Sequence, residues 1–145
     1  MAQADLCGQE PIKITGIIEE EIGLPRNDGT RGSALYEVPF RLSQEPAADW
    51  REFFVHAWNN PSRFTSMHRP GIASVIGSTV ILDGTTVEEV EQYHKETLLL
   101  AVDEANRRVR EHRERIAQSS AREAERVREH REHVVDVARK IDFGG

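Results

Sequence analysis

The chain has 145 residues, which is enough for one modest hydrophobic core, and 30% of them are charged. The formal net charge of −6 is unevenly spread: residues 1–105 carry 8 Lys and Arg against 17 Asp and Glu, whereas residues 106–145 carry 11 against 8. No apolar run approaches the roughly 20 residues that span a bilayer, and the N-terminus lacks the basic and apolar parts of a secretory signal. A single cysteine, Cys7, excludes an intrachain disulfide. We therefore expect a soluble, cytoplasmic protein.

The N-terminal half predicts a small head, residues 11–84, after a flexible lead-in, residues 1–10. Partial alternation and β-branched residues favour a strand within Pro11–Leu24, and clearer alternation predicts a second strand over Ala34–Ser43. The turn-forming residues between them favour an antiparallel hairpin with a long loop. Because proline donates no hydrogen bond, Pro39 places the second strand at an edge of the sheet or at a bulge.

A short helix is expected over Glu45–Pro61, where aromatic and small apolar residues recur at helical spacing. It contains both tryptophans of the chain, so we expect it to fill the core of the head. A second hairpin follows, with strands at Ala73–Ile76 and Thr79–Leu82 joined by a type II′ turn at Gly77-Ser78. The predicted head is an α+β unit in the order β-β-α-β-β, with one helix packed on a small antiparallel sheet.

One long helix is predicted for the rest of the chain, which we call the stalk, residues 85–145. Thr86 and Glu89 have the spacing of a capping box, and neither proline nor glycine occurs from there to Ile141. A helix of about 56 residues is about 84 Å long at 1.5 Å per residue. This length predicts a coiled-coil-like element and not a helix buried within the head.

The heptapeptide RVREHRE occurs twice in the stalk, at Arg108–Glu114 and at Arg126–Glu132. Eighteen residues make five helical turns, so both copies lie on the same side of a straight helix. One narrow apolar stripe follows that side, and we expect it to be an interface with a second copy or with a helix of a larger protein complex. The predicted interface residues are Leu98, Val102, Ala105, Val109, His112, Ile116, Val127, His130, Val134, Ala138 and Ile141.

Two other interpretations of the stalk remain open from the sequence. Ser120 and Glu123 interrupt the stripe and have the spacing of a second capping box, which favours a helical hairpin broken near Ser119-Ser120. The repeat is also consistent with a single solvated helix that carries charged side chains on most of its surface.

Three residues of the head are candidates for binding a polar ligand: His56, His68 and Arg69. An imidazole supplies acid–base chemistry and a guanidinium holds an anion, but no motif places a nucleophile or a carboxylate beside them. His130 and His133 share a helix face without a third ligand, so no metal is expected, and no cofactor is indicated. The stalk arginines alternate with glutamates and lack interleaved aromatics, so neither nucleic acid nor a membrane is the expected partner.

The β-β-α-β-β head and the terminal Gly144-Gly145 together resemble a ubiquitin-like modifier. That resemblance implies activation of the C-terminal carboxylate, although the long helix between head and diglycine departs from the family's pattern. The favoured interpretation is a non-catalytic assembly or adaptor protein that oligomerises or docks on a larger complex through its C-terminal helix. The alternative is a small ligand-binding or enzymatic head that the stalk dimerises.

Overall fold

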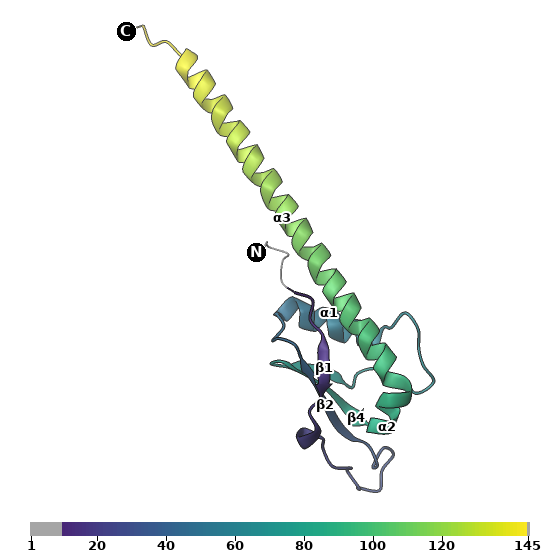
Figure 1. Cartoon of the computed structure of the whole chain (residues 1–145). Helices are drawn as coiled ribbons and strands as arrows, with labels where there is room; N and C mark the ends of the chain where they lie inside the picture. Colours follow the sequence, from purple (N-terminus) through teal and green to yellow (C-terminus); the bar gives the residue numbers. More distant parts are fainter. Residues whose placement is uncertain (1–9, 145) are drawn as a thin grey trace. The chain divides into compact units, whose positions relative to one another are not determined.

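A four-stranded antiparallel sheet followed by a long helix confirms the α+β fold (Figure 1). The computed structural model describes residues 10–144, so the expectations for Cys7, for most of the lead-in and for Gly145 lie outside the described residues. The strand order in the sheet is β1-β2-β4-β3. The elements are β1 (Ile14–Ile17), a 3-10 turn (Glu19–Glu21), β2 (Tyr36–Leu42), α1 (Ala48–Asn59), β3 (Ala73–Ile76), β4 (Thr79–Thr85), α2 (Val87–Glu89), a π-helical turn (Val90–His94) and α3 (Lys95–Lys140).

The β3–β4 hairpin is confirmed. Ile76 pairs with Thr79, so the connecting loop has two residues, and Gly77 has a positive φ of 59°. No such φ occurs at Ser78. A left-handed first residue followed by an ordinary second residue is the pattern of a type II′ turn, which matches the twist of the two strands.

The first strand is shorter than expected. β1 has four residues, and the acidic run Glu19–Glu21 that follows it forms a 3-10 turn with exposed side chains. Three consecutive carboxylates cannot alternate between core and solvent, so the strand pattern ends before them.

Pro39 lies in an interior strand, so the edge position is wrong. Of the two predicted alternatives, an irregularity is present: the pairing of β2 with β4 shifts register between Tyr36 and Glu37, away from Pro39 itself. β2 pairs with β1 on one side and with β4 on the other. In an antiparallel strand, the N and C=O of one residue face the same neighbour. The Pro39 carbonyl accepts from the Ile18 N–H at 3.0 Å, so the missing donor faces the residue just after β1 ends. The pairing of β2 with β4 therefore loses no hydrogen bond at Pro39.

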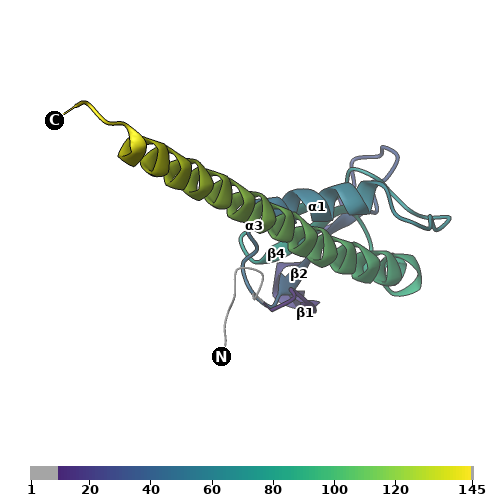
Figure 2. The same cartoon turned by 90° about the horizontal axis from the view of Figure 1, so that it is seen from above.

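One face of the sheet is covered by α1 and the first turns of α3, which lie side by side (Figure 2). Alternate residues of β2 and β4 point into this core, and both tryptophans of α1 are buried there, as expected. Each large side chain buried in this way stabilises the fold by about 1.5–3 kcal/mol. The buried side chains that the sheet and α1 place in this core include Val38, Phe40, Leu42, Trp50, Phe54, Trp58, Val80 and Leu82.

The first part of the apolar stripe packs in this same core. Leu98, Val102, Ala105 and Val109 are buried against the head's own residues, so they are not available as an interface with another chain. Thr97 and Ala101 are buried beside them, and these two residues make the face wide enough to cover a sheet. The compact unit of the chain is accordingly Glu10–Val109, which differs from the predicted head of 11–84.

The remaining described residues, 110–144, form a C-terminal segment that is helical to Lys140. The helix passes through Ser119-Ser120 without a break, so the helical hairpin is wrong. This segment contains exposed ion pairs whose partners are three or four residues apart: Arg126–Glu123, Arg128–Glu125, Arg128–Glu132 and Lys140–Asp136. Each such pair contributes little on its own, although together they favour the helix over the coil.

Candidate functional site

The C-terminal segment carries an apolar stripe that nothing covers within the described residues. Ile116, Val127, Val134 and Ile141 have exposed fractions of 52%, 42%, 47% and 54%. We call these four residues, with the exposed Ala138 between the last two, the exposed stripe. Steps of eleven, seven and four residues place Ile116, Val127, Val134 and Ala138 within a narrow sector of a helix that turns about 100° per residue. Ile141 directly follows the last residue of α3 and continues the same spacing.

The two histidines of the predicted interface lie at one border of the exposed stripe. His112 is half-buried and His130 is exposed. Between Ile116 and Val127 the stripe has small or charged residues, where Ser119, Ser120, Glu123, Ala124 and Val127 line a shallow groove of about 660 Å³. Small side chains at this place leave the helix backbone close to the surface, so a second helix can approach closely there.

The compact unit holds a second chemically distinctive group, a polar cluster of His68, Arg69, Thr85, Glu89 and His94. The Arg69 guanidinium donates to both carboxylate oxygens of Glu89, with the Nη2–Oε2 distance at 2.9 Å. The Thr85 hydroxyl donates to Glu89 Oε1 at 3.0 Å. A bidentate arginine–carboxylate pair is strong and directional, so it fixes the loop after α1 to the last residue of α2.

Helix capping explains how Glu89 comes to this place. Thr86 is the N-cap residue, and its hydroxyl accepts from the Glu89 N–H at 3.1 Å, as the capping box predicts. In a complete capping box the glutamate side chain reaches back to the N-cap N–H. Here the carboxylate of Glu89 binds Arg69 and Thr85 instead, so half of the motif serves a tertiary contact.

Both histidines of the polar cluster pack against Trp58. The ring centroids of His68 and His94 lie 4.6 and 5.5 Å from that of Trp58. His94 is fully buried, and neither imidazole has a hydrogen-bond partner among residues 10–144. Glu89 Oε1 lies 3.7 Å from His94 Nε2, which is longer than a hydrogen bond.

The surroundings of each titratable group in the polar cluster decide which ones are charged. The Arg69 guanidinium, which donates to Glu89, holds the pKa of that carboxyl below its ordinary value. Burial lowers the pKa of His94, against the opposing effect of Glu89, and burial also lowers the pKa of His68. At neutral pH the cluster therefore consists of one ion pair and two uncharged imidazoles.

His94 belongs to the π-helical turn, which the sequence did not predict. Such turns are frequent at functional sites, because the extra residue redirects a side chain out of the regular helical spacing. An uncharged imidazole beside an ion pair has the chemistry for proton transfer to a bound polar ligand. The pockets described below are nevertheless lined by other residues.

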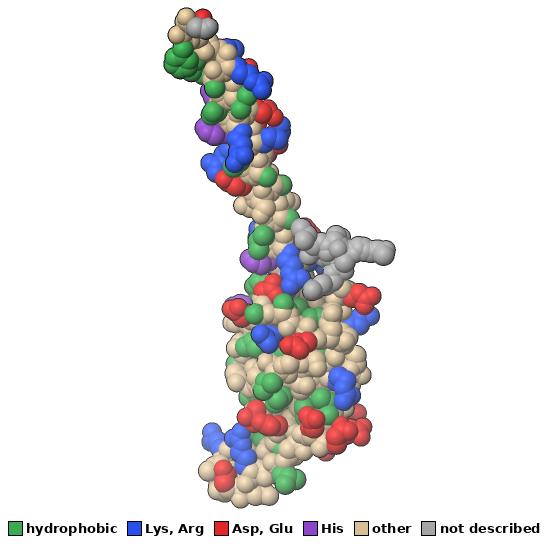
Figure 3. Space-filling model, turned by 90° about the vertical axis from the view of Figure 1, so that its left-hand side faces the viewer, with side chains coloured by type: hydrophobic (Ala, Val, Ile, Leu, Met, Phe, Trp, Pro, Cys, Tyr) green, Lys and Arg blue, Asp and Glu red, His purple; other side chains and the backbone are tan. Residues whose placement is uncertain are grey.

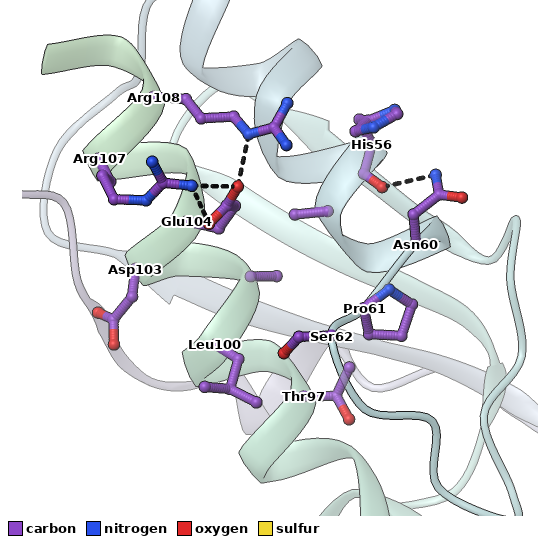
Figure 4. Close-up of a pocket in the computed structure, with 12 residues that line it drawn as sticks. His56, Asn60, Pro61, Ser62, Thr97, Leu100, Asp103, Glu104, Arg107 and Arg108 are labelled. Atoms are coloured by element: carbon purple, nitrogen blue, oxygen red, sulfur yellow. Dashed lines mark hydrogen bonds and ion pairs between the residues drawn. The ribbon is translucent and has the colours of Figure 1, made fainter. Parts of the chain in front are cut away.

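His56 lies apart from His68 and Arg69, in a pocket of about 410 Å³ between the end of α1 and α3 (Figure 4). The structure thus brings together two of the three predicted ligand-binding residues and leaves the third elsewhere. On the α3 side, Glu104 accepts from Arg107 at 2.7 Å and from Arg108 at 2.5 Å. These arginines, Arg107 first, lower the pKa of Glu104, so the pocket wall carries paired charges.

A third pocket, of about 370 Å³, is an apolar groove between β1 and the start of the long helix. Its walls include Ile14 and Ile17 of β1 and Leu99 of α3. Ile17 and Leu99 are partly exposed at its mouth. The groove contains few polar groups to orient a ligand, so it indicates no particular chemistry.

Asn106 is the residue of structural importance that sequence reasoning missed. Its side-chain oxygen accepts from the Ile12 N–H at 3.0 Å and from the Trp50 indole at 2.9 Å, and its NH₂ donates to the Ile12 carbonyl at 2.9 Å. One amide thus joins α3 to α1 and to the chain before β1. The only signal in the sequence was a polar residue directly after a stripe position.

No three His, Cys, Asp or Glu side chains among residues 10–144 come together as a metal site. Within the same range, no helix has the length and apolar character to cross a membrane. Gly144 follows the end of α3, and its N–H donates to Asp142. The resemblance to a ubiquitin-like modifier stays untested.

Comparison with known proteins yields no relative. No family model matches the chain, and neither the curated proteins nor the solved structures contain a match. Function must therefore be inferred from the chain's own surfaces and sites.

Proposed function

We propose that this protein is a non-catalytic assembly protein that docks through the exposed stripe of its C-terminal helix. The observation that supports this is the exposure of Ile116, Val127, Val134 and Ile141 on one side of residues 110–141. Single exposed apolar residues are common on any protein. Four large ones in register along about seven turns, bordered by a repeated heptapeptide, are typical of a helix that packs on another helix.

Charge pairing alone does not account for this pattern. Exposed Arg–Glu pairs stabilise an isolated helix without any apolar stripe, and such pairs are present along the segment. The exposed apolar side chains add nothing to a solvated helix, since valine and isoleucine have lower helix propensity than alanine. Their placement at stripe positions is explained if another surface covers them in the assembled state.

Site-specific cross-linking in the protein's native cells tests the proposal. A photoreactive residue at Val127 or Val134 should give a discrete cross-linked product, whose mass distinguishes a second copy from another protein. The same residue at Glu129 or Asp136, on the opposite side of the helix, should not give that product. Equal labelling at all four positions, or none at any, contradicts docking through the stripe.

A second candidate function, binding of a small polar ligand by the compact unit, is supported by the unpartnered imidazoles of His68 and His94. His68→Ala and Arg69→Ala then lose a ligand-induced rise in Tm that the unchanged protein shows with a set of small carboxylates and phosphates. His133→Ala, in the C-terminal segment, serves as the control and keeps the rise. No rise in the unchanged protein, or a rise that persists in both cluster variants, rejects this candidate.

A further inference from the structure

The charges of the C-terminal segment are sorted by side of the helix. Residues 110–141 contain nine Lys and Arg and seven Asp and Glu. At about 100° per residue, six of the seven acidic residues fall in a sector of about 60° opposite the exposed stripe. All nine basic residues fall between that sector and the stripe, on one flank or the other. The stripe therefore has a basic rim along each side, and the acidic side chains face away from it.

The rims are clearest in the second copy of the repeat. Arg131 lies about 60° from the centre of the stripe on one flank, and Arg126 lies about 80° from it on the other. Figure 3 shows hydrophobic and histidine side chains along one edge of this segment, with blue Lys and Arg beside them. Arg128 binds Glu125 and Glu132, so its ion pairs are made on the side away from the stripe.

One acidic residue departs from this arrangement. Glu123 falls on the stripe itself, where it lines the shallow groove and forms an ion pair with Arg126. Both of these side chains are largely exposed. This pair neutralises part of one rim at the centre of the segment and leaves Arg131 and the basic residues near both ends unchanged.

A second copy of the chain does not complement these rims. In a coiled coil, the residues that flank the apolar seam of one helix meet the flanking residues of the other. In a parallel pair, Arg126 of one copy lies beside Arg131 of the other. In an antiparallel pair, each rim also meets a basic rim. Like charges at these positions disfavour pairing, and natural coiled coils use this to select partners.

We infer that the exposed stripe binds an amphipathic helix of another protein whose own apolar seam is flanked by Asp and Glu. This inference rests on the proposed function, because it assigns the chemistry of the partner to the same stripe. Acidic flanks on the partner face Arg131 on one side and Arg126 on the other. The exposed stripe from Ile116 to Ile141 has a length of about 38 Å, so the partner helix has about 25 residues in contact.

Two designed peptides test the inference against the full-length chain. Both are helices of about four heptads with leucine at every seam position. One has glutamate at every flanking position and the other has lysine, so each repels itself to a similar extent. Fluorescence anisotropy at about 0.1 M salt should show the glutamate peptide binding at least about tenfold more tightly than the lysine peptide. Added salt should reduce the difference.

Adjacent valines supply the matched control for the stripe. Val134 lies on the stripe and Val135 lies about 100° away, and their exposed fractions are 47% and 45%. Val134→Glu should weaken binding of the glutamate peptide by about tenfold or more, since it places an unpaired charge in the seam. Val135→Glu should change it by less than about threefold. Circular dichroism checks that both variants keep the helix.

Reversal of the rim charges tests the specificity directly. A chain with Arg126→Glu and Arg131→Glu should prefer the lysine peptide. A chain with Arg122→Glu and Arg139→Glu has the same net charge, but both substitutions lie farther from the stripe. It should keep its preference for the glutamate peptide.

The remaining outcomes separate this inference from the proposed function. Equal binding of both peptides overturns the acidic partner and leaves docking through the stripe in place. Light scattering that shows a stable dimer, which Val134→Glu disrupts and neither peptide displaces, identifies a second copy as the occupant and also overturns the inference. Binding to vesicles with anionic lipids, without binding of either peptide, assigns the stripe to a membrane surface and overturns both. No binding in any arm overturns the inference, and the cross-linking experiment then decides the proposed function.

Discussion

The two parts of α3 have the same periodicity and opposite environments. From Lys95 to Val109, apolar residues occupy most of one helix face and are buried in the core of the compact unit. From Arg110 to Lys140, large apolar residues recur mainly once in seven or eleven positions, and they are exposed. The difference shows that the width of an apolar face, and not its period, separates a helix that belongs to a domain's core from one left to meet another chain.

The largest expected effect comes from placing a charge in each part of the helix. Val102→Asp should destabilise the compact unit by more than about 3 kcal/mol, because the carboxylate is buried without a partner. Val127→Asp, on the exposed stripe, should shift Tm by less than about 2 °C. Near-UV circular dichroism of the two tryptophans, both buried in this core, measures the unfolding. Similar losses in the two variants would contradict the distinction between the two parts of the helix.

Asn106 tests the same comparison of the two parts of α3 with a polar residue, because it lies in the part that belongs to the compact unit. Asn106→Ala removes three hydrogen bonds to Ile12 and Trp50 and should cost about 2–3 kcal/mol. Asn106→Asp keeps the two accepted bonds and should cost less. Gln118→Ala, an exposed amide of the C-terminal segment, is the control and should leave the stability unchanged. Denaturant unfolding gives the free energies, and an Asn106→Ala value equal to the control would reject the joining role.

A smaller effect is expected from pH, and it should be confined to the compact unit. Burial lowers the pKa of His94 in the folded state, so the unfolded chain binds a proton more readily just below the ordinary value of about 6.5. Stability is therefore fully present above that pH and should fall as the pH decreases from 7.5 to 5.5. The lowered pKa of Glu89 acts in the same direction only at more acidic pH.

Substitution of His94 measures how much of this pH dependence of stability comes from its imidazole. His94→Leu should reduce the slope of Tm against pH between 7.5 and 5.5, and His133→Leu should leave it unchanged. His68, whose pKa burial also lowers, should account for part of the remaining slope. A slope in His94→Leu equal to that of the unchanged protein would show that the buried imidazole does not control it.

The fold was predictable because turn and capping residues act on neighbours in the sequence, whereas the contacts of Asn106 and Glu89 join residues that are distant in the sequence. Gly77-Ser78 forms a hairpin turn of two residues, and the Thr86 hydroxyl accepts from the N–H of Glu89, three residues further on, so both features could be predicted. Asn106 and Ile12 are 94 positions apart, and no local pattern connects them. Glu89 matches a capping box, which already explains an acidic residue at this position, so the sequence contains no separate indication of its contact with Arg69. The stripe itself is predictable, but its periodicity does not separate the half that covers the sheet from the half that is exposed, because the covering half is specified by contacts with distant strands.

Thiol accessibility tests the central claim most directly. Cys7→Ser first removes the native thiol. In that background, Val134→Cys places one thiol on the exposed stripe, and Asp136→Cys places one on the opposite side of the same helix. In the purified protein alone, both thiols should react with maleimide at similar rates. In extract of the native cells, the thiol at position 134 should react at least about tenfold more slowly, while that at 136 keeps its rate. Equal rates at both positions in the extract would contradict a covered stripe.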